Sequence, residues 1–276
     1  MINIFNLTDK NALITGAAGL LGFQHTIALI KAGANVILTD VDMKKLASNV
    51  IELEKMGFSK QIRFFFMDVT RYESIKEVFD ALVLEGVAVN ILINNAAVDP
   101  KVNKNKSLDE ASRFENFPLD QWNFQLSVGL TGAFLCSQIF GSEMARKDLG
   151  GVILNIASDL SVFAPDNRIY RIKDLEENMQ PVKPITYSVI KTALIGMTKY
   201  LAVYWADKNI RVNALSPGGV YNDQPDEFVT KLSTLIPMGR MAKKDEYQGA
   251  IQFLCSDAST YMTGQNIVID GGRSVW

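Results

Sequence analysis

Short hydrophobic runs alternate along the chain with longer stretches in which hydrophobic positions recur at helical spacing. Continuous hydrophobic runs are typical of strands that are buried on both faces of a parallel sheet. The helical spacing predicts amphipathic helices that cover such a sheet. Strands are expected at residues 11–15, 35–40, 61–68, 90–94, 151–158, 210–216 and 266–270. Helices are expected at residues 20–32, 42–56, 72–85, 119–147, 186–206 and 243–256.

This regular alternation predicts an α/β fold with a doubly wound, seven-stranded parallel sheet flanked by helices. The 276 residues suffice for one large domain. No internal repeat is visible, and no linker rich in Pro, Gly or Ser divides the chain. We therefore expect a single domain that spans residues 1–276.

Two long polar segments interrupt the alternation, at residues 99–118 and 159–185. The second contains Pro165, Pro181 and Pro184. Long connections in compact domains are usually functional or disordered. Both segments follow strands, and ligands bind at the carboxyl ends of strands in open α/β sheets. We interpret them as walls or lids of a substrate site, with plain surface loops as the alternative.

The charge balance argues against several classes of partner. The formal net charge is only -2, and acids and bases are interspersed. This pattern predicts neither a nucleic-acid groove nor a membrane-binding surface. The first residues lack the pattern of a signal peptide, so a cytoplasmic location is expected.

Cysteine and histidine are too scarce to suggest a metal site or a histidine-based hydrolase. Cys136 and Cys255 fall in apolar helical runs and are interpreted as buried core thiols. His25 is the single histidine, and a surface or packing role is expected for it. No metal site is predicted.

The first predicted strand runs into the turn T-G-A-A-G-L-L-G at residues 15–22, which opens a helix. In this context backbone N–H groups approach a pyrophosphate, and the helix N-terminus favours its negative charge. Gly16 is expected to form the turn, Gly19 to permit close approach and Gly22 to let the helix pack on the strand. Leu21 lies within the same turn.

The second predicted strand ends in Asp40. A carboxylate at this position accepts hydrogen bonds from the adenosine ribose and repels a 2′-phosphate. No Arg or Lys occurs at residues 35–43, so NAD is predicted in preference to NADP. The alternative is that Asp40, or Asp42 beside it, caps the next helix, and Asp42 is the stronger candidate for that role.

Further cofactor contacts are expected where later strands end, although each candidate could also simply mark a strand terminus. Asp68 and Val69 are placed to border the adenine, and Asn95 and Ala96 to let the backbone pass close to the ribose. The turn after the sixth strand is expected to present backbone groups to the nicotinamide carboxamide. Its candidate residues are Pro217, Gly218 and Val220.

Tyr187 and Lys191 open a predicted helix, and residues four apart share a helix face. An unperturbed tyrosine has a pKa of about 10. A fixed lysine ammonium nearby favours the phenolate and makes the tyrosine a usable acid or base. Ser158, at the end of the fifth strand, can hydrogen-bond the substrate oxygen or the tyrosine hydroxyl.

This ordered set of motifs resembles the short-chain dehydrogenase/reductase family over essentially the whole chain. The resemblance rests on the glycine turn, Asp40, Asp68-Val69, the N-N-A-A run at 94–97, Ser158, Tyr187-x-x-x-Lys191, the S-P-G turn at 216–218 and the D-G-G run at 270–272. It implies a single-domain Rossmann fold and hydride transfer between a secondary alcohol and a ketone. It also implies that Tyr187 is the general acid/base, that Lys191 lowers its pKa and binds the nicotinamide ribose, and that Ser158 orients the substrate.

Three features depart from the family pattern. The glycine spacing resembles that of longer members that act on nucleotide sugars. Gly129 stands where the family has an asparagine that kinks a helix and helps to hold a water leading to the lysine. Glycine tolerates a kink, and its carbonyl could still hold the water, but the proton relay is in question. The insert at 159–185 also separates Ser158 from Tyr187 by more than the usual spacing.

The two polar segments carry several cations that suit a phosphate or carboxylate, among mixed charges. They are Lys101, Lys104, Lys106, Arg113, Arg168, Arg171, Lys173 and Lys183. With Gly129 and the glycine turn, they resemble family members linked to bacterial surface-sugar or flagellin-glycan synthesis. The predicted substrate is a small molecule, a sugar or sugar derivative, and an anionic sugar is among the candidates. A hydroxysteroid or keto-acyl reductase and a non-catalytic NAD-binding sensor or scaffold are the alternatives.

The predicted helices at 119–147 and 186–206 are long and apolar. In the family these helices form oligomer interfaces, so a homotetramer or homodimer is expected, with ordinary core packing as the alternative. Residues 273–276 are then expected near an interface or a neighbouring site.

Overall fold

The computed structural model describes residues 3–98, 112–148 and 150–276. Its centre is a parallel sheet in the order β3-β2-β1-β4-β5-β6-β7, which confirms the predicted doubly wound, seven-stranded Rossmann architecture. The strands are β1 (Asn11–Thr15), β2 (Asn35–Asp40), β3 (Ile62–Phe66), β4 (Ile91–Asn94), β5 (Gly151–Ile156), β6 (Ile210–Pro217) and β7 (Asn266–Ile269).

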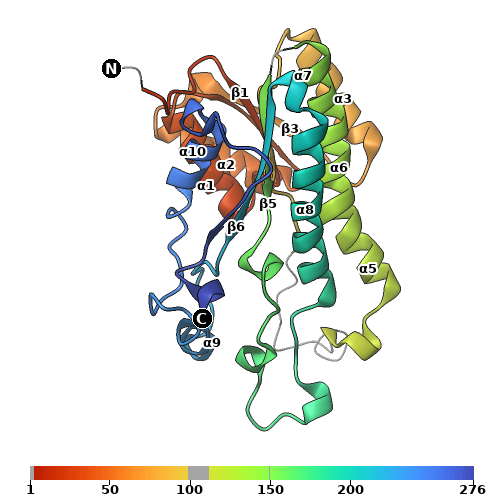
Figure 1. Ribbon diagram of the computed structural model, residues 1–276, viewed down its shortest axis with the longest axis vertical. Coiled ribbons are helices and arrows are strands. Elements are labelled where there is room, and N and C mark those ends of the chain that lie inside the picture. The colour runs from red at the N-terminus through yellow and green to blue at the C-terminus, as the bar shows by residue number, and fades with distance from the viewer. Residues whose placement is uncertain (1–2, 99–111, 149) are drawn as a thin grey trace.

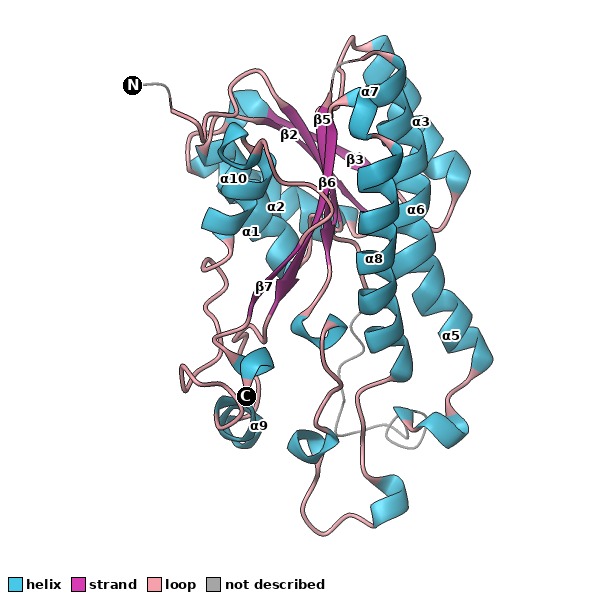
Figure 2. Ribbon diagram, viewed as in Figure 1, coloured by secondary structure: helices cyan, strands magenta, loops and turns pink. Residues whose placement is uncertain are grey.

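Helices cover both faces of this sheet (Figures 1 and 2). One face is covered by α1 (Leu20–Lys31), α2 (Met43–Lys55) and α10 (Gln248–Cys255). The other face is covered by α3 (Tyr72–Leu84), α8 (Ile185–Tyr204) and a long helix whose segments are α5 (Leu119–Leu126), α6 (Gly132–Cys136) and α7 (Ser142–Arg146). The short helix α9 (Asp226–Ser233) lies beyond the sheet.

Two hydrophobic cores result, one on each face, because successive residues of a strand point to opposite sides. Ala12 and Ile14 of β1 belong to the core under α1 and α10, whereas Leu13 belongs to the core under α3 and α8. In β2, Val36 joins the first core and Ile37 the second. The strands are therefore apolar on both faces because both faces are buried.

The predicted elements agree with the structure except at some ends. The third strand covers only Ile62–Phe66 of the expected 61–68. The helix expected at 243–256 begins at Gln248, because Glu246 accepts the Lys243 backbone N–H and pairs with Arg240 in a turn before it. The sequence interpretation missed α9, although Pro225 with Asp226 and Glu227 forms a typical helix start.

The long helix runs without a break from Leu119 to Arg146 and contains two π-helical turns, Ser127–Thr131 and Ser137–Gly141. By length and composition alone it could cross a membrane. Cys136, Phe140 and Met144 of this helix are buried in the second core, which lies between the helix and the sheet. Its apolar character is thus explained by packing within the fold.

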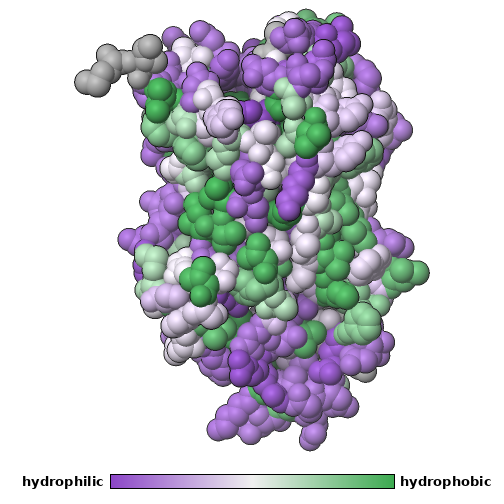
Figure 3. All heavy atoms as spheres, in the orientation of Figure 1, coloured by the Kyte–Doolittle hydropathy of each residue, from purple (hydrophilic) through white to green (hydrophobic). Residues whose placement is uncertain are grey.

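The carboxyl ends of the strands face the lower end of the molecule in Figure 1, where the 159–185 insert, α9 and the C-terminus gather. The insert is folded: the Gln180 amide bonds the backbone of Ile172 and Leu175, and Ile169 packs with Leu232 of α9. This lower end is largely hydrophilic, whereas hydrophobic side chains gather in the middle of the same face (Figure 3). The fold thus places a polar, structured segment where ligands bind in such sheets.

Candidate functional site

The glycine turn after β1 is held close to the end of β4. Gly16 has a φ of +64°, and a Cβ at this position would lie 2.8 Å from the Ala96 Cα. A side chain is therefore excluded both by backbone conformation and by space. Gly22 packs against the turn itself, since a Cβ there would lie 2.8 Å from the Ala17 Cα, rather than against the strand as expected.

Asn95 fastens this turn, a role that the sequence interpretation did not assign to it. Its Nδ2 donates to the carbonyl oxygens of Thr15 and Gly16, each at 3.0 Å. The backbone N–H groups of Asn95 and Ala96 both donate to the Thr15 Oγ1 at 3.0 Å. The side chain of Asn95 thus braces the backbone that would contact the cofactor.

The N-terminus of α1 fits a dinucleotide pyrophosphate. Gly19 is the N-cap, and no side chain caps this end or places a carboxylate in the first turn among the described residues. Uncapped N–H groups at a helix start, next to a glycine-containing turn, form an anion-binding site. Leu21 is half-buried in this first turn. The predicted residues Gly16, Gly19, Leu21 and Gly22 would hold the pyrophosphate here.

Asp40 and Asp42 have different roles. Asp42 is the N-cap of α2, and its carboxylate accepts from the Lys45 N–H, as predicted for this residue. Asp40 does not cap α2: its Oδ2 accepts from the Ala18 N–H at 2.9 Å and its Oδ1 from the Asp42 N–H at 3.0 Å. The Asp40 carboxylate is thereby fixed at the end of β2, beside the glycine turn.

The other predicted cofactor residues lie at the same edge of the sheet. The Asp68 carboxylate accepts from the Thr70 N–H at 2.9 Å, and the Val69 side chain is buried against Gly132. After β6, Gly218 approaches the Asp270 Cα so closely that a Cβ would lie 2.8 Å away. Pro217 ends β6, and Val220 forms an isolated bridge with Ala242.

The structure fixes the Lys191 ammonium at the end of β5, the strand that Ser158 follows. The buried Lys191 ammonium donates to the Ile156 carbonyl at 2.8 Å, two residues before Ser158. Tyr187 lies one turn before Lys191 on α8, with the Lys191 Nζ 5.8 Å from its ring centroid. The Ser158 Oγ is buried and donates to the Asp159 carboxylate at 2.9 Å. The ammonium is thus fixed beside the tyrosine, as proton transfer by a tyrosine requires.

Lys183, at the end of the insert, adds a second cation to Tyr187. Its ammonium lies 3.8 Å from the centroid of the Tyr187 ring. The sequence interpretation counted Lys183 only among many cations, because its contact with Tyr187 depends on the folded insert. The Lys183 N–H donates to the Asn167 side chain at 3.2 Å, which ties this segment to the middle of the insert.

The other cations of the two polar segments have different surroundings. Arg113 pairs with Glu115, Arg168 with Asp166, and Arg171 with Glu177. These ion pairs neutralise three of the cations expected to attract an anionic substrate. Lys173 is exposed. Lys101, Lys104 and Lys106 lie outside the described residues.

Gly129 lies in the first π-helical turn of the long helix, opposite α8. A Cβ at Gly129 would lie 2.8 Å from the Cγ2 of Ile190, the residue before Lys191. The family's asparagine therefore has no room here, because the buried Ile190 side chain takes its space. The π turn supplies an irregularity at the point where the family has a kinked helix.

The lone histidine and both cysteines are buried, as expected for packing residues. Burial lowers the pKa of the His25 imidazole to about 3, and neither ring nitrogen has a hydrogen-bond partner among the described residues. Burial raises the pKa of the Cys136 and Cys255 thiols to about 12. No cluster of metal-ligating side chains occurs in the part of the chain that the structure describes.

Comparison with known families supports the interpretation of this site. Residues 10–170 match the family described as short chain dehydrogenase. Residues 174–274 match the family described as Enoyl-(Acyl carrier protein) reductase. The two matches together span β1 to β7 and include every predicted site residue.

Individual relatives share the full length of the chain. An NAD-dependent glycerol dehydrogenase of Listeria innocua is 32% identical, over 98% of this chain and 96% of that protein. The structure of a short chain dehydrogenase from Leptospira borgpetersenii with bound NAD+ is 32% identical, with a TM-score of 0.82 over 100% of this chain and 97% of that chain. A gluconate 5-dehydrogenase from Burkholderia cenocepacia, in complex with NADP and tartrate, is 26% identical, with a TM-score of 0.82 over 99% and 98% of the two chains.

Proposed function

The chain belongs to the short-chain dehydrogenase family of oxidoreductases, and from this premise we propose that it interconverts a secondary alcohol and a ketone on a sugar or sugar derivative. The observation that carries the proposal is the position of the Lys191 ammonium. It is anchored 2.8 Å from the Ile156 carbonyl, on the strand that Ser158 follows, and it lies 5.8 Å from the centroid of the Tyr187 ring.

Each of these three side chains has a distinct task in the proposed reaction. Oxidation of an alcohol removes a proton from its oxygen and a hydride from its carbon. Tyr187 takes the proton, and the ammonium groups of Lys191 and Lys183 favour the phenolate that this step requires. Ser158 holds the substrate oxygen in place. NAD, when bound along the glycine turn, supplies the hydride acceptor.

NAD is the proposed cofactor, in preference to NADP. The Asp40 carboxylate is held beside the glycine turn by two backbone N–H groups. Its charge suits ribose hydroxyls and opposes a 2′-phosphate. The glycerol dehydrogenase relative is NAD-dependent, although the gluconate 5-dehydrogenase structure contains NADP.

The proposed substrate class rests on relatives and on the polar site mouth. The relatives named above act, by their names, on glycerol and gluconate. The insert at the mouth is polar, and Lys183 offers a positive charge beside Tyr187 for a carboxylate or phosphate of the substrate. The narrower expectation, surface-sugar or flagellin-glycan synthesis, stays a prediction, as does the cytoplasmic location.

The test mixes purified protein with NAD and a panel of polyols, sugar acids, sugar phosphates and nucleotide sugars, and follows nicotinamide reduction at 340 nm. Tyr187→Phe removes the proton acceptor, and Tyr261→Phe is the matched control on the exposed surface. We expect turnover of one sugar class that Tyr187→Phe abolishes and Tyr261→Phe preserves. Turnover that survives in Tyr187→Phe would refute the proposed mechanism.

Two alternatives are distinguished by the same panel. The match of residues 174–274 to a family described as Enoyl-(Acyl carrier protein) reductase favours an acyl thioester substrate. Hydroxyacyl thioesters, the alcohol forms that NAD can oxidise, and hydroxysteroids are therefore included, and turnover of these alone would replace the sugar. NAD binding without turnover of any substrate would support the non-catalytic sensor or scaffold.

We further propose that the chain forms a homotetramer or homodimer through α8. This helix exposes Tyr200, Val203 and Tyr204, with 66%, 80% and 61% of their surface accessible. The rings of Tyr200 and Tyr204 stack with their centroids 5.7 Å apart. An exposed aromatic and aliphatic face of this kind is typical of a protein interface. A monomer by light scattering at micromolar concentration would refute this proposal.

A further inference from the structure

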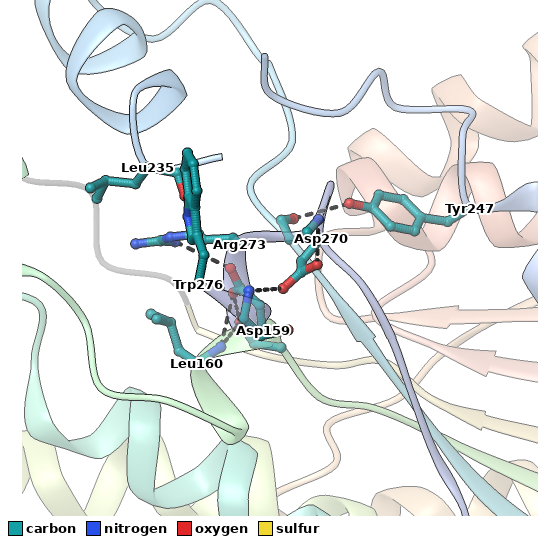
Figure 4. Close-up of polar contacts among 11 residues, drawn as sticks. Asp159, Leu160, Leu235, Tyr247, Asp270, Arg273 and Trp276 are labelled. Atoms are coloured by element: carbon teal, nitrogen blue, oxygen red, sulfur yellow. Dashed lines mark hydrogen bonds and ion pairs between the residues drawn. The ribbon is translucent and has the colours of Figure 1, made fainter. Parts of the chain in front are cut away.

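A buried ion pair joins the last residues of the chain to the residue that follows Ser158. The Arg273 Nη1 lies 3.1 Å from the Asp159 Oδ2, and the two side chains are only 8% and 4% exposed. Figure 4 shows Arg273 and Asp159 facing each other. Buried charges persist when they are paired and hydrogen-bonded. This pair is unlike the exposed Arg168–Asp166 and Arg171–Glu177 pairs of the insert.

The C-terminal segment is built to deliver Arg273 to this position. Asp270 accepts from the Gly272 N–H at 2.9 Å and from the Ser274 N–H at 2.7 Å, which closes a tight turn. The Trp276 Nε1 donates to the Leu235 carbonyl at 3.0 Å and fastens the end of the chain (Figure 4). The Arg273 guanidinium also lies 5.0 Å from the Phe163 ring centroid, a cation–π contact with the insert.

The other oxygen of the same carboxylate fixes Ser158. The Asp159 Oδ1 accepts from the Ser158 Oγ at 2.9 Å and from the Leu160 N–H at 2.9 Å. The Leu160 N–H also lies 3.2 Å from the Ser158 Oγ, which therefore both donates and accepts. Because the Asp159 carboxylate lies between Ser158 and Arg273, the orientation of the serine hydroxyl depends on the arginine.

We propose that Asp159 and Arg273 are positioning residues for the hydride-transfer reaction, which hold the Ser158 hydroxyl in its productive orientation. The inference rests on the proposed function and adds two residues to its machinery. Arg273 fixes Asp159, and Asp159 fixes Ser158, so the folded C-terminal segment is part of the active site. Neither residue contacts the reacting atoms in this scheme.

The first test compares steady-state kinetics of the full-length chain with those of Arg273→Met and Asp159→Asn. We expect Arg273→Met to lower kcat about 10- to 100-fold, the range that small misplacements of a reacting group produce. The affinity for NAD, measured by titrating the protein's intrinsic fluorescence with NAD in the absence of substrate, is expected to stay unchanged. Arg273→Lys keeps the charge and is expected to recover most of kcat. Arg63→Met removes the exposed pair with Glu85 and serves as the matched control.

The double variant separates positioning from simple loss of an ion pair. Arg273→Met leaves a buried carboxylate without its partner, which is the most disruptive state. Asp159→Asn keeps an acceptor oxygen for Ser158 and carries no charge. We therefore expect Asp159→Asn/Arg273→Met to have a higher kcat than Arg273→Met alone. A double variant no better than the single one would overturn the inference.

A pH profile supplies a readout that a purely structural role would not move. Burial raises the pKa of the Asp159 carboxyl, and Arg273 opposes that rise. The other titratable groups around this pair include Tyr247 before α10 and Asp270 after β7, whose charge acts on Tyr247. They also include Asp166 of the insert, whose pKa is lowered by Arg273, and Lys191 of α8, whose ammonium bonds the Ile156 carbonyl of β5. Without Arg273 the carboxyl binds its proton at higher pH, so the acid limb of kcat is expected to move to higher pH.

The outcomes also separate this inference from the proposed function. Tyr187-dependent turnover in the native chain, with unchanged kcat and acid limb in Arg273→Met, would overturn only the positioning role. A native chain without Tyr187-dependent turnover would overturn the proposed function and the positioning role together.

Discussion

Substitution of Gly129 tests the packing between the long helix and α8 beside the site. A Cβ at this residue would lie 2.8 Å from the Ile190 Cγ2 and 3.4 Å from its Cδ1. Overpacking of a core typically costs about 1–3 kcal/mol. Replacing Gly by Ala in a helix interior gains about 1 kcal/mol of helix propensity. With a mid-range overpacking cost of about 2 kcal/mol, Gly129→Ala should lower the free energy of unfolding by about 1 kcal/mol.

The contact with Ile190 can be isolated by a double-mutant cycle. Ile190→Ala alone should lower the free energy of unfolding by about 2–5 kcal/mol through the cavity that it leaves. In that background the new Cβ meets no Ile190 side chain, so Gly129→Ala should instead stabilise by about 1 kcal/mol. The expected coupling between the two positions is therefore about 2 kcal/mol, within the range for residues in contact.

The measurement is urea unfolding of the native protein, the two single variants and the double variant at one protein concentration, monitored by far-ultraviolet circular dichroism. Gly249→Ala on α10 is the control, because a Cβ there meets nothing within 4 Å. It should stabilise by about 0.5–1 kcal/mol. Equal effects of Gly129→Ala with and without the Ile190 side chain would refute the packing argument. Because Ile190 precedes Lys191, Gly129→Asn is further expected to lower kcat rather than to raise it.

Three further predictions follow from single residues. Asp40→Ser should lower the NAD-to-NADP ratio of kcat/KM by tenfold or more, since the charge that opposes a 2′-phosphate is gone; an unchanged ratio, as expected for Asp42→Ser, would contradict this role. His25→Leu should raise the free energy of unfolding at pH 7 by about 1–3 kcal/mol, because two unpartnered ring nitrogens are removed. The unfolded chain protonates His25 near pH 6.5 and the folded chain only near pH 3, so His25 lowers the free energy of unfolding as pH falls through this window, by about 1.4 kcal/mol per pH unit. In urea unfolding at several pH values, His25→Leu should therefore lose less stability on acidification than the native chain. Equal pH dependence of the two free energies would refute the argument. Lys183→Met should move the rise of kcat with pH to higher pH, whereas the exposed Lys173→Met should not; coincident profiles would show that the cation beside Tyr187 has no electrostatic effect.

The sheet could be predicted from the sequence because its strands are buried on both faces. Residues 12–14 and 36–38 are apolar at every position, and their alternate residues divide between the two cores. Right-handed crossovers then leave few strand orders. The start of α10 was less predictable, because it is set by the side chain of Glu246, which bonds the Lys243 backbone and pairs with Arg240. This turn leaves the hydrophobic pattern of residues 243–256 unchanged, so the pattern does not reveal where the helix begins.

The catalytic candidates could be named because Tyr187 and Lys191 have the spacing of the family motif and Ser158 follows a predicted strand. The contacts that support them could not be predicted. Asp159 and Arg273 are 114 residues apart, and they meet because β7 pairs with β6 and Asp270 closes the turn that follows it. The sequence offered equal reason to choose Arg168 or Arg171, which pair with exposed acids instead. A charged side chain acquires a role at a site through burial, and burial depends on contacts between distant segments. The residues that orient Ser158 can therefore be identified only in the folded chain, because the local sequence pattern does not show which distant segments meet.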